Sequence, residues 1–82
     1  MTQKLFLENL QFDVLMIIRE GLEQSKFSIK RAQELSEFAL DFIRSDLTMD
    51  QIFELKEKLI LIPELNSLEK EIATYIKVQS NA

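Results

Sequence analysis

Carboxylates are the only side chains in this sequence whose type and spacing could support chemistry. Glu34, Glu37 and Asp41 recur at helical spacing, an arrangement that could bind a metal ion or exchange protons. A two-metal site in a helical bundle also needs Glu followed by His three residues later, and an EF-hand loop needs a central Gly. The chain has no His, and its single Gly lies elsewhere. We therefore interpret this series as solvated helix surface. The same holds for a second acidic series, which consists of Asp46, Asp50 and Glu54.

Other side chains that commonly carry catalysis are missing from the chain. It has no His, Cys or Trp, so the usual general base near neutral pH, the thiol nucleophile and most transition-metal ligand sets are absent. A single Gly also rules out a glycine-rich phosphate loop. The sequence therefore predicts a non-enzymatic protein with no catalytic residue, no metal site and no cofactor.

A basic segment at residues 25–31 is the one place where nucleic acid could be contacted. Lys26, Lys30 and Arg31 surround Phe27, so phosphates could bind there while Phe27 stacks on a base. In the alternative interpretation, Phe27 packs onto its own helix and the basic side chains keep a loop solvated. We favour the alternative because the net charge of −4 opposes attraction to phosphate. A small nucleic-acid-associated accessory protein stays as the second functional hypothesis.

The composition predicts an all-α protein. Of 82 residues, 46% are hydrophobic, and one Gly and one Pro leave few turn signals while favouring long helices. The length suits one domain, residues 1–82. No uninterrupted apolar run approaches the roughly 20 residues that span a bilayer. The lack of Cys fits an intracellular protein, so we expect an acidic, cytoplasmic protein that does not insert into membranes.

Apolar residues spaced by three and four predict four helices. Ser28 is expected to cap the second helix, and Thr48 with Gln51 forms a capping-box pattern before the third. Pro63 is expected to end the third helix and to occupy the first position of the fourth. The predicted helices cover residues 3–24, 29–45, 49–61 and 63–78.

Each predicted helix has an apolar stripe that we expect to face the core. Phe42 and Ile72 are expected to be buried in the middle of the second and fourth stripes. Gly21 lies on the first stripe, where it could end the helix, kink it or let a neighbouring backbone approach closely. The first stripe consists of Leu7, Leu10, Val14, Ile17 and Gly21.

Short connections between the helices predict that sequence neighbours pack together, often antiparallel. The expected fold is a small four-helix bundle or a pair of helical hairpins, which dimerisation could complete. Because Pro63 leaves almost no loop, the third and fourth helices could also meet at a wide angle.

The first predicted helix has more apolar residues than one stripe can use. Five follow each other from Val14 to Ile18, and at about 100° per residue they point to every side of a helix. Leu5, Phe12 and Met16 lie across the helix from the stripe. We predict that these three form an interface with a protein partner or a second copy, with a homodimer as the favoured form. In the competing hypothesis, this helix is enclosed by the rest of the chain.

Overall fold

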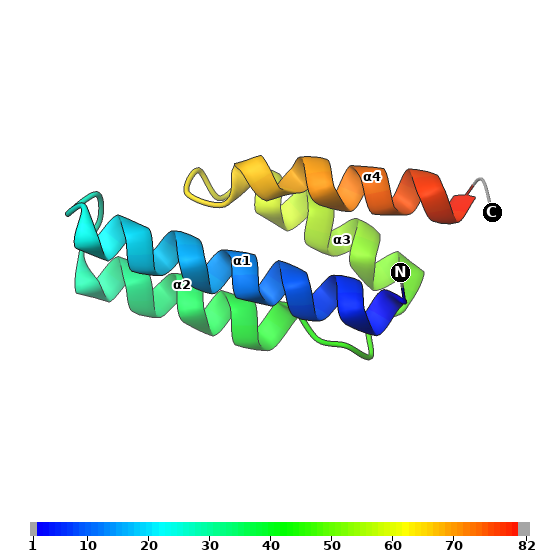
Figure 1. The fold of residues 1–82 in the computed structure, drawn as a ribbon, viewed down its shortest axis with the longest axis horizontal. Helices are drawn as coiled ribbons and strands as arrows, with labels where there is room; N and C mark the ends of the chain where they lie inside the picture. The colour runs from blue at the N-terminus through cyan, green and yellow to red at the C-terminus, as the bar shows by residue number, and fades with distance from the viewer. Residues whose placement is uncertain (1, 81–82) are drawn as a thin grey trace. The chain divides into compact units, whose positions relative to one another are not determined.

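The computed structural model describes residues 2–80, in which the chain forms α-helices, one short 3₁₀ segment and connecting turns (Figure 1). This part of the chain contains no strand, so the predicted all-α fold is confirmed. The chain divides into two compact units, Met1–Asp46 and Leu47–Ala82, a division that our prediction of one domain did not include. The elements are α1 (Gln3–Glu23), α2 (Ile29–Phe42), α3 (Met49–Ile60), η1 (Asn66–Leu68) and α4 (Glu69–Ser80).

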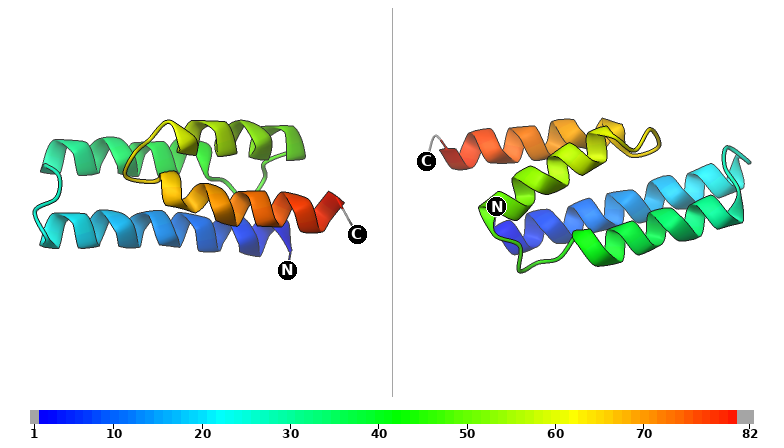
Figure 2. Two further views of the ribbon diagram at one scale, coloured as in Figure 1. Left: turned by 90° about the horizontal axis from the view of Figure 1, so that it is seen from above. Right: turned by 180° about the vertical axis from the view of Figure 1, so that it is seen from behind.

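The first unit is an antiparallel hairpin of α1 and α2, which lie side by side along most of their length (Figures 1 and 2). Ser28 caps α2 as predicted, because its hydroxyl accepts a hydrogen bond from the Arg31 amide at 3.1 Å. Our first stripe was wrong at one position: Ile18 is buried and Ile17 is only half-buried. The buried residues of the two helices are Phe6, Leu7, Leu10, Val14, Ile18 and Gly21 of α1, and Ala32, Leu35 and Ala39 of α2.

A tight turn joins α1 to α2. The Lys26 amide donates to the Gly21 carbonyl at 2.8 Å, and the Ser25 amide donates to the Leu22 carbonyl at 3.2 Å. These are the two hydrogen bonds of a Schellman motif. Ser25 takes the left-handed position of that motif with a φ of 55°, where Gly is usually found because it has no Cβ. The end of α1 is therefore set by this motif, a few residues after Gly21.

Gly21 lies within α1 and makes room for an aromatic ring. A Cβ built at this position would be 2.0 Å from Cε1 and 2.2 Å from Cζ of Phe27, far inside van der Waals contact. The close neighbour is thus a side chain, whereas the sequence suggested a helix end, a kink or a backbone. Phe27 packs back onto α1 across the turn, which closes this end of the hairpin.

At the other end of the hairpin, α2 stops at Phe42, three residues before the predicted end. The side-chain amide of Gln11, on α1, donates to the backbone carbonyls of Ala39 at 3.5 Å and Ile43 at 3.3 Å. The Ala39 carbonyl also accepts the Ile43 amide at 3.1 Å, whereas carbonyls at the very end of a helix lack partners within the helix. Gln11 therefore supplies a donor to the Ile43 carbonyl from the neighbouring helix, and Ile43 turns away from helical geometry with a ψ of 88°.

Phe42 is not in the core, which corrects our prediction. Its side chain is 41% exposed, and its ring lies 5.1 Å from that of Phe38, with the two planes tilted by 35°. Phe42 is the last residue of α2, and its ring packs against Phe38 one turn earlier on the same helix. Ile43 follows outside the helix and is buried instead.

In the second unit, α3 begins with the predicted capping box. The Thr48 hydroxyl accepts from the Gln51 amide at 3.2 Å, and the Thr48 amide donates to the Gln51 side chain at 2.8 Å. Lys56 of α3 forms an ion pair with Glu69 at the start of α4, with 3.6 Å between Nζ and Oε1. The two helices pack as a hairpin in which they are inclined to each other (Figure 2).

The connection from α3 to α4 differs from our prediction. Pro63 lies in a turn, and α4 begins six residues later at Glu69, after the 3₁₀ segment η1. The prediction failed because Pro at the first position of a helix is a preference that a turn also satisfies. Most of the expected apolar seam, which consists of Leu65, Leu68, Ile72, Tyr75 and Gln79, is nevertheless buried. The first four residues are buried, and Gln79 is exposed, which corrects the prediction at that position. Leu65 and Leu68 precede α4.

Candidate protein-interaction surface

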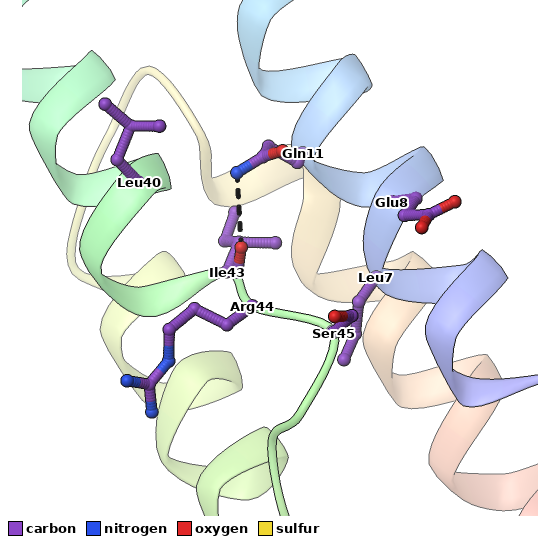
Figure 3. A pocket seen from close by; sticks show the side chains of 7 residues that line it. All are labelled: Leu7, Glu8, Gln11, Leu40, Ile43, Arg44 and Ser45. Atoms are coloured by element: carbon purple, nitrogen blue, oxygen red, sulfur yellow. Dashed lines mark hydrogen bonds between the residues drawn. The ribbon is translucent and has the colours of Figure 1, made fainter.

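Two neighbouring hollows lie between α1 and α2 within the first unit and share Leu40. The hollow toward the α1–α2 turn is lined by Ile18, Leu22, Ile29, Ala32, Gln33, Ser36, Glu37 and Leu40. The hollow toward the open end is lined by Leu7, Glu8, Gln11, Leu40, Ile43, Arg44 and Ser45 (Figure 3). We call the two together the α1/α2 groove.

Regular helical spacing places the groove residues in two rows. On α1 the row is Gln11, Leu15, Ile18 and Leu22, and on α2 it is Ile29, Gln33, Ser36 and Leu40. Leu15 belongs to the α1 row by its spacing. Both rows step by four, three and four residues, so each stays on one side of its helix. Each row borders the buried stripe of its own helix, and the groove is therefore a continuation of the hairpin's apolar face.

The groove exposes much apolar surface at its α2 edge. Ile29 is 72% exposed and Leu40 is 68% exposed, and both line the groove. Between them Ser36 is half-buried and Ala32 is buried. Two large side chains thus stand on either side of small ones, a relief into which side chains of another helix can fit.

Polar groups lie at the open end of the groove. Figure 3 shows the Gln11 amide pointing from α1 toward the Ile43 carbonyl, with Leu40 and Arg44 on the opposite side. Arg44 also forms an ion pair with Asp46, with 3.6 Å between Nε and Oδ1. Because both groups of that ion pair are at least half exposed, the pair contributes little to stability. The Gln11 side chain thus holds the end of α2 against α1.

The interface residues predicted from the sequence lie on a different face of α1. Leu5 is 47% exposed and Phe12 is 60% exposed, while Met16 is half-buried. Arg19 and Glu23 follow them at helical spacing and form an exposed ion pair at 3.1 Å. We call Leu5, Phe12 and Met16 the outer face of α1. Within its own unit, Phe12 is therefore not covered by α2.

The basic residues Lys26, Lys30 and Arg31 lie around the start of α2. Arg31 forms an ion pair with Glu34 at 3.1 Å, and Phe27 packs on Gly21. The ring that could stack on a base is therefore occupied in part by a contact within the hairpin.

The acidic series do not form a metal site in the structure. Within residues 2–80, no three His, Cys, Asp or Glu side chains gather closely enough to hold a metal ion. The same stretch contains no helix that is both long and apolar enough to cross a membrane. Comparison with family models, curated proteins and solved structures finds no match to this chain.

Sequence reasoning missed the groove residues Leu22, Ile29 and Leu40. Their signal was present in the spacing of four, three and four residues. This spacing was not recognised in the sequence for two reasons. Ile29 is next to polar residues at the start of a helix, and Leu40 is next to Ala39 and close to Ile43, which form a stronger apolar pattern. Only the pairing of α1 with α2 shows that both rows border one groove.

Proposed function

We propose that this chain is a non-enzymatic protein-interaction module that binds a protein through the α1/α2 groove. The observation that carries the proposal is the exposure of Ile29 and Leu40, 72% and 68%, on the edge of an apolar groove. Large apolar side chains that gather on one hollowed surface mark contact sites, whereas scattered ones are ordinary. Removing two such side chains from water favours association.

The shape of the groove supports a helix as the bound element. One row of residues lies on each side of the groove, and both rows have a spacing of three and four. An amphipathic helix could pack its own apolar row between them. The small residues Ala32 and Ser36 leave space for a large side chain between Ile29 and Leu40. We place this function in the cytoplasm, which suits an acidic chain without Cys.

Site-specific photo-crosslinking in native cells tests the proposal. A photoreactive amino acid at Leu40 should give a discrete protein adduct. The same group at Glu34, an exposed residue on another side of α2, is the matched control and should not. Adding Ile29→Glu should abolish the Leu40 adduct. Equal adducts at both positions, or none at either, would overturn the proposal, and an adduct with nucleic acid alone would favour the accessory role of Lys26, Lys30 and Arg31.

A further inference from the structure

We propose that the occupant of the α1/α2 groove is a second copy of this chain, packed antiparallel so that two α1/α2 hairpins form a four-helix bundle. This inference rests on the proposed function, because it names the partner of the same groove.

The α2 row is complementary to itself when it is reversed. The row runs Ile29, Gln33, Ser36, Leu40. When a second copy packs antiparallel, with the two-fold axis between Gln33 and Ser36, Ile29 of each copy contacts Leu40 of the other. These are the two large groove residues with the greatest exposure. The same axis brings Gln33 to Ser36, a polar pair whose hydrogen bond would hold this register.

The same two-fold axis also pairs the residues of the α1 row. Its order is Gln11, Leu15, Ile18, Leu22, so an axis between Leu15 and Ile18 brings these two residues together and Gln11 to Leu22.

The two axes coincide in the folded hairpin. Ile18 and Gln33 line the same hollow, as do Leu22 and Ile29, and Gln11 lines the other hollow with Leu40. Three of the four α1 residues therefore share a hollow with the α2 residue that the axis requires. One two-fold axis therefore satisfies both rows at once, which is the condition for a closed symmetric dimer.

Charges flanking the α2 row favour this arrangement. Lys30 lies on the outer side of the row, and Glu37 and Asp41 follow on the same side at helical spacing. In the antiparallel register, Lys30 of one copy lies between Glu37 and Asp41 of the other, and symmetry forms this contact twice. In the opposite arrangement, with both α1–α2 turns at one end, α2 of each copy would face α1 of the other, and the contacts of Lys30 with Glu37 and Asp41 would not form.

The oligomeric state of the purified chain is the first test. We expect sedimentation equilibrium to give twice the 9.6 kDa of one chain. Leu40→Glu should raise the dissociation constant at least about 30-fold while far-UV circular dichroism stays unchanged, because Leu40 is exposed in the single chain. Phe12→Glu with Met16→Glu, on the outer face of α1, is the matched control and should leave the dimer intact.

Cysteine crosslinking tests the register, since the natural chain has no Cys. Ile29→Cys chains mixed with Leu40→Cys chains should form an intermolecular disulfide on oxidation. Ile29→Cys mixed with Leu22→Cys should not, because that pair meets only when both turns lie at one end. Crosslinking of the second mixture and not of the first would overturn the antiparallel arrangement.

Other outcomes separate this inference from the proposed function. A chain that stays monomeric at millimolar concentration overturns the second copy, and the groove still binds a protein if Leu40 forms an adduct in cells. A dimer lost in the outer-face variant but kept in Leu40→Glu overturns it as well and assigns self-association to Phe12 and Met16. A monomer with no cellular adduct overturns both.

Discussion

The two hairpins of this protein differ in the interactions that fix one helix end, the end of α1 in the first and the start of α3 in the second. The α1–α2 turn depends on contacts between residues of different elements: Phe27 fills the space above Gly21, and Ser25 accepts an unfavourable φ. The α3–α4 unit begins instead with a capping box made by Thr48 and a residue three positions later. The comparison shows that helix starts can be set by local sequence, while a turn between packed helices depends on what the helices bring together.

Truncation of the buried seam in the second hairpin should have the largest effect. Ile72 is fully buried, so Ile72→Ala should leave a cavity and lower the free energy of unfolding by about 2–5 kcal/mol. Phe42→Ala is the contrast, with an expected cost below about 1 kcal/mol because Phe42 is 41% exposed. Urea unfolding followed by circular dichroism measures both. A change within about 0.5 kcal/mol for Ile72→Ala would contradict the burial of α4.

Substitution of Gly21 should give the next largest effect on the free energy of unfolding, and the sign of that effect should depend on Phe27. Gly21→Ala should lower the free energy of unfolding by about 1–2 kcal/mol, because the overpacking against Phe27 exceeds the gain in helix propensity. In a Phe27→Ala background the clash is gone, and the same substitution should stabilise the protein by up to about 1 kcal/mol. Thermal unfolding of the four proteins gives the coupling between the two positions. Equal effects of Gly21→Ala in both backgrounds would mean that the ring does not depend on Gly21.

Removing the capping box of α3 should cost less. Thr48→Ala removes the acceptor for the Gln51 amide, so the free energy of unfolding should fall by about 1 kcal/mol. Thr48→Ser retains a hydroxyl at the same place and should stay close to the parent. Urea unfolding compares the three proteins, and a Thr48→Ser variant as unstable as Thr48→Ala would assign the effect to the methyl group of Thr48 instead.

The smallest effect is expected at the α1–α2 turn, and it has the opposite direction. Ser25 has a φ of 55°, a conformation that Gly adopts without a steric penalty. Ser25→Gly should therefore stabilise the protein by about 0.5 kcal/mol, after the greater freedom of Gly in the unfolded chain is subtracted. Thermal unfolding measures the shift, with Ser45→Gly, outside the helices, as the control that should not stabilise. A destabilised Ser25→Gly variant would show that the Ser25 side chain contributes to the turn.

Most of the secondary structure could be predicted from the sequence, whereas the candidate site could not. Ser28 and Thr48 marked the starts of α2 and α3 correctly because a cap acts on amides two or three residues away. The same reasoning failed at Pro63, since its fixed φ suits a turn as well as a helix. The outer face of α1 was predicted from the spacing along one helix. A groove forms between two helices, so it could not be predicted in that way.

The sequence by itself determined that the chain is helical, where α2 and α3 begin, and that Leu65, Leu68, Ile72 and Tyr75 are buried. Those features follow from helical periodicity and from hydrogen bonds between residues close in sequence. Only the tertiary structure decided that Gly21 makes room for Phe27, that Gln11 reaches the end of α2, and that Ile29 and Leu40 border a groove shared with α1. Each of these depends on which helix lies beside another and at what level, and the spacing of residues along one helix does not contain that information.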